Sequence, residues 1–176
     1  MSVILLADDS PHAQRMGQRI LAEEGHQVVC VSDGEAAALR LPEVDADVVI
    51  ADAHLPGLSG LELCRCIKSS SRYVRVILTA GSLEDLDEAA ARGAGCDAIL
   101  RKPFEASVLA QALLPLLEAA KRDRQLISMA AAATSRAPSA AAAPDDIRAA
   151  VERAVERELP RLLDELTQRV LLALGH

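Results

Sequence analysis

The chain has 176 residues, of which 51% are hydrophobic and 26% are charged, so it can bury a sizeable core and is not disordered throughout. Aromatic residues amount to 1% and tryptophan is absent, which argues against aromatic platforms for single-stranded nucleic acid or sugars. The net charge of −7 argues against a general polyanion-binding surface.

Short apolar runs alternate with longer stretches of helical periodicity over residues 1–121. Near-continuous apolar runs are typical of parallel strands that helices cover on both faces. We therefore expect an α/β domain with a doubly wound, five-stranded parallel sheet, and functional residues at the carboxyl ends of its strands. Pro115 is a candidate kink in the last helix. The predicted strands are 3–7, 27–31, 48–51, 74–78 and 98–100. The predicted helices are 11–25, 34–39, 61–68, 84–92 and 105–120.

The composition changes over residues 122–144, and within this segment residues 130–143 are rich in alanine and small polar residues and lack the large apolar side chains that pack a core. We expect a linker in this segment. Its start is expected to be partly helical, because alanine is the best helix former, and Pro138 and Pro144 interrupt it.

Residues 145–176 are predicted to form an amphipathic helix that Pro160 kinks or divides. The helix needs a partner surface, because a helix of this length is not stable alone in water. Self-association is the first expectation, while docking on another protein and folding back on residues 1–121 stay open. A membrane-surface helix is disfavoured, because acids and arginines alternate and aromatic residues are absent. The apolar stripe consists of Ile147, Val151, Val155, Leu159, Leu162, Leu166 and Val170.

The sequence predicts neither a membrane span nor a signal peptide, because its longest apolar runs are strand-sized and no basic segment precedes the first. We expect a cytoplasmic protein with free thiols. Cys64 and Cys66 are separated by one residue, which fits neither a zinc knuckle nor a redox pair.

Five side chains with the chemistry of phosphoryl transfer follow or end the predicted strands. They are Asp8, Asp9, Asp52, Thr79 and Lys102. Carboxylate oxygens suit a hard cation such as Mg²⁺. A hydroxyl and a lysine can bind phosphoryl oxygens while a carboxylate attacks phosphorus as a nucleophile.

These residues, the loop 55–60 and the Lys102-Pro103-Phe104 segment occur in the order and spacing of a known family. Over about residues 2–121 the sequence resembles the receiver domain of two-component response regulators. The resemblance implies a flavodoxin-like sheet of order 2-1-3-4-5. It also implies that Asp52 is the phosphoacceptor, Thr79 the switch hydroxyl and Lys102 the phosphate-binding cation, with a cis Lys102–Pro103 peptide.

The same resemblance implies a Mg²⁺ cofactor. Asp9, Asp52 and the backbone carbonyl of His54 would bind it directly, and Asp8 would act through water. His54 also stands two residues after Asp52, where the family controls the access of water, so the lifetime of the phosphoryl group is left open.

One departure from the family concerns signal propagation. Ile99 stands three residues before Lys102, where the family usually has an aromatic switch residue, and Tyr73 does not occupy that position. Phosphorylation is therefore expected to be intact while the propagation of the signal differs.

The sequence favours a phosphorylation-controlled binding module over an enzyme. A histidine kinase or phosphotransfer protein would phosphorylate Asp52, and the change would alter binding to a protein partner or to a second copy through residues 145–174. Nucleic-acid binding is not expected, because residues 122–176 carry no net charge. The alternative is a constitutive scaffold that the C-terminal helix assembles and whose receiver works largely without phosphorylation.

Overall fold

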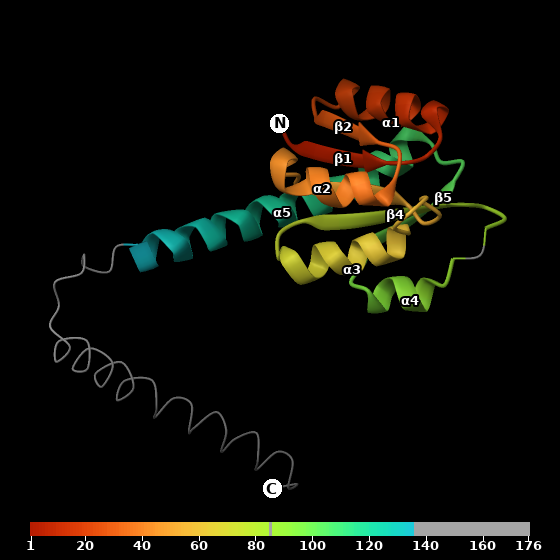
Figure 1. Ribbon diagram of the computed structural model, residues 1–176. Helices are drawn as coiled ribbons and strands as arrows, with labels where there is room; N and C mark the ends of the chain where they lie inside the picture. Colours follow the sequence, from red (N-terminus) through yellow and green to blue (C-terminus); the bar gives the residue numbers. More distant parts are fainter. Residues whose placement is uncertain (85, 136–176) are drawn as a thin grey trace, which may run out of the picture. The chain divides into compact units, whose positions relative to one another are not determined.

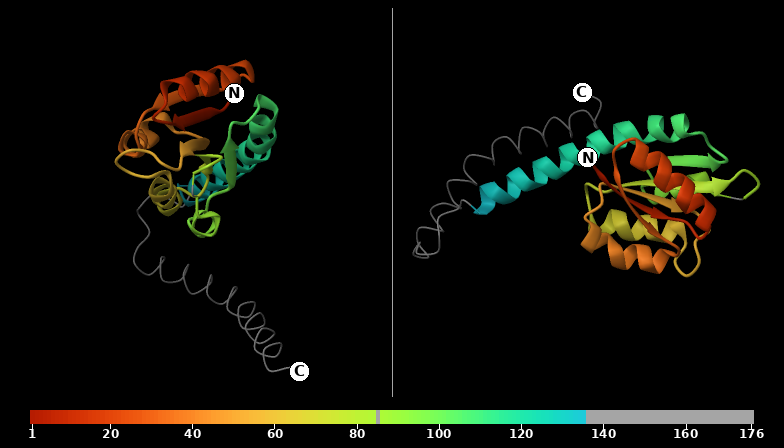
Figure 2. Two further views of the ribbon diagram at one scale, coloured as in Figure 1. Left: turned by 90° about the vertical axis from the view of Figure 1, so that its right-hand side faces the viewer. Right: turned by 90° about the horizontal axis from the view of Figure 1, so that it is seen from above.

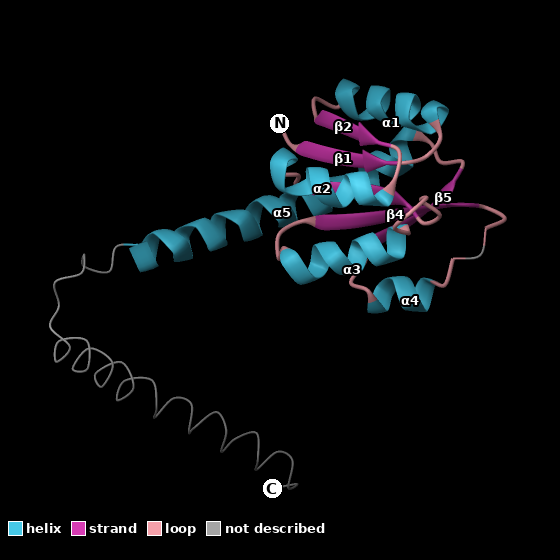
Figure 3. Ribbon diagram, viewed as in Figure 1, coloured by secondary structure: helices cyan, strands magenta, loops and turns pink. Residues whose placement is uncertain are grey.

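The computed structural model describes residues 1–84 and 86–135, and residues 1–128 form one compact unit (Figure 1). Strands and helices alternate along it without exception (Figure 3). The strands are β1 (Val3–Ala7), β2 (Gln27–Val31), β3 (Val48–Asp52), β4 (Arg75–Gly81) and β5 (Ala98–Lys102). The helices are α1 (Pro11–Glu23), α2 (Gly34–Val44), α3 (Gly60–Ser70), α4 (Glu88–Gly93) and α5 (Ala106–Ser135).

All four strand pairings are parallel, and the sheet has the order β2-β1-β3-β4-β5. The prediction of a doubly wound, five-stranded sheet is thus confirmed. In this order β1 and β3 are neighbours in the middle of the sheet. The residues that follow them therefore lie side by side at one edge.

The two faces of the sheet carry separate hydrophobic layers, because successive strand residues point to opposite sides. On one face Ile4, Leu6 and Ile50 pack with side chains of α1 and α5. On the other face Leu5 and Val49 pack with side chains of α2, α3 and α4. Figure 2 shows the sheet between these helices from two further directions.

Side-chain caps begin the helices shortly after the strands end. Ser10 caps α1, and Ser59 caps α3 through a capping box with Glu62. Asp87 caps α4 by accepting a hydrogen bond of 2.9 Å from the backbone nitrogen of Ala90. This cap explains why α4 begins at Glu88 and not at residue 84 as predicted.

Helix α5 is longer than the predicted 105–120. It passes through Pro115 as one element and continues to Ser135, so the start of the predicted linker 122–144 is helical. Asp123 and Arg124 in this continuation form ion pairs with the body of the domain. Residues 136–144 and the predicted amphipathic helix of residues 145–176 lie outside the described residues.

Among the described residues no helix combines the length and the hydrophobicity needed to cross a bilayer. The described chain contains four free cysteines, and Cys64 is the buried one.

Candidate functional site

Three of the five predicted side chains meet at the carboxyl edge of the sheet. Lys102, at the end of β5, donates a hydrogen bond of 2.5 Å from Nζ to Oδ2 of Asp8, which directly follows β1. It also donates to Oδ2 of Asp52, at the end of β3. The Asp8 and Asp52 side chains are only 4% and 9% exposed, so both carboxylates are held out of bulk water.

The charges at this edge do not balance. Burial of Lys102 disfavours its charged form, but its hydrogen bonds to Asp52 and Asp8 outweigh this effect and raise the pKa of the ammonium group. Lys102 therefore stays charged near neutral pH. One cation then faces two buried carboxylates, and the excess negative charge favours a further cation.

The position of Asp52 is fixed by its own backbone surroundings. Its Oδ1 accepts a hydrogen bond of 2.7 Å from the backbone nitrogen of His54. Gly60, the first residue of α3, lies against the main chain of Asp52. A Cβ at Gly60 would come within 2.2 Å of the Asp52 carbonyl oxygen, so this close approach requires glycine.

Thr79 lies beside Asp52 on the neighbouring strand. The two residues are register partners in the β3–β4 pair, and Thr79 is 2% exposed. Its backbone oxygen accepts a hydrogen bond of 2.7 Å from Ala53, directly after β3. Thr79 thus lies in β4, next to Asp52 of the adjacent strand β3, which is the candidate phosphoacceptor.

Asp9 is the exception among the predicted residues. It is exposed, and within the described chain it forms no hydrogen bond or ion pair with the other four side chains. Asp8, in contrast, is fixed in place, because its Oδ1 accepts a hydrogen bond of 2.9 Å from the backbone nitrogen of Ser10 and its carbonyl oxygen accepts one of 2.6 Å from Gln14.

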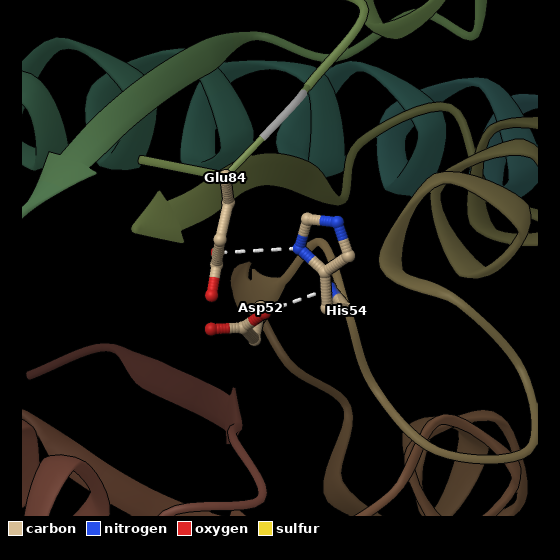
Figure 4. Close-up of side chains that lie close together, drawn as sticks. All are labelled: Asp52, His54 and Glu84. Atoms are coloured by element: carbon tan, nitrogen blue, oxygen red, sulfur yellow. Dashed lines mark hydrogen bonds and ion pairs between the residues drawn. The ribbon is translucent and has the colours of Figure 1, made fainter. Parts of the chain in front are cut away.

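Sequence reasoning missed Glu84. The structure places its Oε2 3.2 Å from Nδ1 of His54, beside Asp52 (Figure 4). The sequence assigned Glu84 to the predicted helix 84–92, but the residue lies in the turn after β4. Because His54 and Glu84 are far apart in the sequence, no local sequence pattern predicts their contact.

Two expectations about neighbouring residues are confirmed. The Lys102–Pro103 peptide is cis. Tyr73 lies away from the switch position, because its hydroxyl donates to Asp45 at 2.8 Å and its ring packs under Arg124. Ile99 itself is partly buried against the hydrophobic layer of α2, α3 and α4.

The sequence of residues 4–114, more than half of the chain, matches the response regulator receiver domain. The sensory/regulatory protein RpfC of Xanthomonas campestris is 33% identical over 117 residues, which are 64% of this chain and 16% of that protein. The transcriptional regulatory protein TcrA of Mycobacterium tuberculosis is 34% identical over 101 residues, which are 57% of this chain and 40% of that protein. The chain thus spans less than half the length of either curated relative.

Solved structures share the fold. A response regulator receiver domain protein from Clostridium thermocellum has 30% identity and a TM-score of 0.63, and the match covers 72% of this chain and 99% of that one. The receiver domain of a signal transduction histidine kinase from Syntrophus aciditrophicus has 31% identity and a TM-score of 0.63, with 69% and 94% covered.

Proposed function

We propose that this chain, which belongs to the response regulator receiver family, accepts a phosphoryl group on Asp52 from a histidine kinase or a phosphotransfer protein. The observation that carries the proposal is the pairing of two buried carboxylates, Asp8 and Asp52, with one lysine, Lys102. The arrangement combines a buried nucleophile with a cation that can follow the incoming negative charge.

The donor set fits a Mg²⁺ ion. Two buried carboxylates with a single ammonium partner leave an excess negative charge, and carboxylate and carbonyl oxygens are the ligands that Mg²⁺ takes. Asp9, Asp52 and the carbonyl of His54 would hold the ion, with Asp8 acting through water. When bound, Mg²⁺ supplies positive charge against the phosphoryl oxygens.

The transfer exchanges one bond to phosphorus for another. A carboxylate oxygen of Asp52 attacks phosphorus, the new O–P bond forms as the donor's P–N bond breaks, and the electron pair of that bond returns to the donor's imidazole. Lys102 releases the Asp52 oxygen that it now contacts and binds a phosphoryl oxygen with its ammonium group. The Thr79 hydroxyl donates a hydrogen bond to another phosphoryl oxygen.

The output of this step is a change in protein binding. Movement of Thr79 toward the phosphoryl group would shift the turn after β4 and the surface formed by α4, β5 and α5. Residues 145–174 are the proposed element of self-association or partner binding. The chain would thus act as a phosphoacceptor signalling protein and not as an enzyme on an external substrate.

A second function rests on Ile99. Because an isoleucine replaces the usual aromatic switch residue, the receiver would serve as a constitutive scaffold if phosphorylation does not reach the output surface. The two functions differ in one measurable property, which is whether the assembly state responds to the chemistry of Asp52.

The test adds a phosphoryl analogue to the protein and measures the mass of the protein in solution. Beryllofluoride with Mg²⁺ is expected to bind the full chain and not the Asp52→Asn variant, which lacks the nucleophilic carboxylate. Acetyl phosphate should likewise label the chain and leave Asp52→Ala unlabelled, and undiminished labelling of that variant would overturn the assignment. A change in mass by light scattering on adding beryllofluoride supports the switch, whereas an unchanged oligomer supports the scaffold.

A further inference from the structure

Three potential metal ligands of mixed chemistry lie together on the side of Asp52 that faces His54 (Figure 4). One ligand atom each from Asp52, His54 and Glu84 lies within 4.8 Å of the other two. Among residues 1–84 and 86–135, this is the one such group of three. The Asp52 carboxylate is buried, while the His54 and Glu84 side chains are about half exposed, which leaves an open path for an ion.

The ligand chemistry separates this group from the oxygen-only donors proposed for Mg²⁺. Here the side-chain nitrogen of His54 takes part, together with the carboxylate of Glu84, which that donor set does not use. One imidazole with two carboxylates suits zinc and neighbouring transition metals, whereas Mg²⁺ prefers oxygen ligands.

The spacing also fits a transition metal. Metal–ligand bonds of zinc at a tetrahedral angle place a nitrogen and an oxygen ligand about 3.3 Å apart. The separation of His54 Nδ1 and Glu84 Oε2 is 3.2 Å. A metal ion can therefore bridge these two atoms at their present separation.

The segment after β3 that carries His54 and the turn after β4 that carries Glu84 are held in place by contacts that do not use the ligand atom of His54. The backbone nitrogen of His54 donates to Asp52. In the turn after β4, the backbone nitrogen of Gly81 donates a hydrogen bond of 2.5 Å to Oε2 of Glu84. The backbone nitrogen of Glu84 donates one of 3.2 Å to the carbonyl oxygen of Gly81. Arg101 donates to the carbonyl of Glu84 at 2.9 Å and so fixes this turn from the side of β5.

We propose that Asp52, His54 and Glu84 bind a divalent transition-metal ion of the zinc class, with water in the remaining coordination positions. Its regulatory consequence rests on the proposed function of Asp52. A zinc-class ion held by His54 and Glu84 also takes the Asp52 carboxylate, which the proposed Mg²⁺ site needs, so the two ions compete for Asp52. Zinc-class ions therefore inhibit phosphoryl uptake by this chain, in opposition to Mg²⁺.

Binding is tested on the full chain with Zn²⁺ by calorimetry and with Co²⁺ by visible absorption. All proteins carry Cys66→Ser, because Cys66 is an exposed thiol that could bind these ions itself. His54→Asn and Glu84→Gln should each weaken Zn²⁺ binding at least about tenfold, because loss of even an outer-shell partner commonly costs that much. The controls His12→Asn and Glu23→Gln, both exposed residues of α1, should bind Zn²⁺ like the parent.

The Co²⁺ spectrum reports ligand identity independently of affinity. The parent should give absorption typical of a site with fewer than six ligands, and His54→Asn should lose it. Equal Zn²⁺ affinity in His54→Asn, Glu84→Gln and the controls would overturn the site. So would loss of binding in only one of the two variants, or no binding by the parent.

The regulatory consequence is tested with acetyl phosphate and Mg²⁺, with and without Zn²⁺. Zn²⁺ should slow labelling of the parent, and Glu84→Gln should be labelled normally and resist Zn²⁺. If no protein is labelled even without Zn²⁺, the proposed function of Asp52 fails, while the Co²⁺ spectrum still decides whether the metal site exists. Equal Zn²⁺ inhibition of parent and Glu84→Gln would refute the inhibitory role.

Discussion

Lys102 and Asp8 contact each other directly although two strands separate β5 from β1, and Nζ of Lys102 lies 2.5 Å from Oδ2 of Asp8. The same ammonium group also contacts Asp52. The long lysine side chain thus spans the edge of the sheet and neutralises part of the charge of two buried carboxylates at once.

Replacing Lys102 by methionine is therefore expected to destabilise the fold. Breaking a buried ion pair leaves an uncompensated charge, and with the partial exposure of Lys102 the expected loss is about 2–3 kcal/mol in the free energy of unfolding. Urea unfolding of Lys102→Met near neutral pH measures it.

A double-mutant cycle separates this charge effect from lost packing. Asp52→Asn should recover part of the stability in the Lys102→Met background, because it removes one of the two unpaired charges. Strictly additive effects of the two substitutions would show that the carboxylates and the lysine do not interact as the distances indicate.

Gly60 offers a test of how closely α3 approaches the site. A Cβ at this position would meet the backbone of Asp52, which cannot move aside as a flexible side chain can. Gly60→Ala should cost about 3 kcal/mol in the free energy of unfolding and weaken beryllofluoride binding, because it displaces the main chain of Asp52. Chemical denaturation and calorimetry measure the two effects.

Gly93, the last residue of α4, is the matched control. A Cβ there has no atom within 4 Å. Gly93→Ala should be neutral or stabilising by up to about 1 kcal/mol, because alanine restricts the unfolded chain. Similar losses for both variants would mean that the contact between Gly60 and Asp52 is not the cause.

The sequence could predict the sheet and the proximity of Asp8, Asp52 and Lys102, because five apolar runs define parallel strands whose carboxyl ends share one edge. It could not predict the contact of His54 with Glu84, because a turn and not a helix follows β4. Asp87 caps α4, so the helix begins at Glu88 and Glu84 is left in the turn before it. The helical periodicity of residues 84–92 gives no sign of this later start.

The continuation of α5 beyond residue 120 also could not be predicted from local sequence patterns. Composition alone places 122–144 outside the core, since few large apolar residues occur there. The structure holds the first part of this segment against the domain through ion pairs of Asp123 and Arg124, whose partners lie far away in the sequence. Local patterns carry no information on such contacts.

Arg124 is predicted to stabilise the domain. It donates hydrogen bonds to Asp45 at 2.7 Å and lies 3.2 Å from Asp47, and its guanidinium stacks 4.6 Å above the ring of Tyr73. Arg124→Ala should cost about 1–2 kcal/mol, because charged hydrogen bonds and a cation–π contact are lost together. Thermal or urea unfolding measures the loss.

Arg122 is the control for Arg124, since it is an exposed arginine in the same turn of α5. Arg122→Ala should change the stability by less than about 0.5 kcal/mol, as is usual for exposed positions. Amide exchange should also quicken around residues 122–128 in Arg124→Ala alone. Equal behaviour of the two variants would show that the contacts of Arg124 do not anchor the helix.

His26 is expected to make stability depend on pH. Burial, with smaller contributions from Lys121 and the N-terminal ammonium group, lowers the pKa of His26 from its usual 6.5, and its Nδ1 is buried without a hydrogen-bond partner among the described residues. As the pH falls through 6.5, the unfolded chain takes up a proton that the folded chain does not. Stability therefore decreases until the pH passes below the folded pKa, and it is unaffected by His26 above 6.5.

Urea unfolding at about pH 7.5 and about pH 5.5, on either side of the ordinary histidine pKa, tests this with His26→Gln, which cannot titrate. The parent should lose more stability between the two conditions than the variant, because all other groups contribute equally to both proteins. Lys121→Met should reduce the loss of stability, since it removes a positive charge that opposes protonation of His26. The same pH dependence in parent and His26→Gln would mean that the folded chain accommodates the charged imidazole, and that the buried Nδ1 finds a partner when protonated.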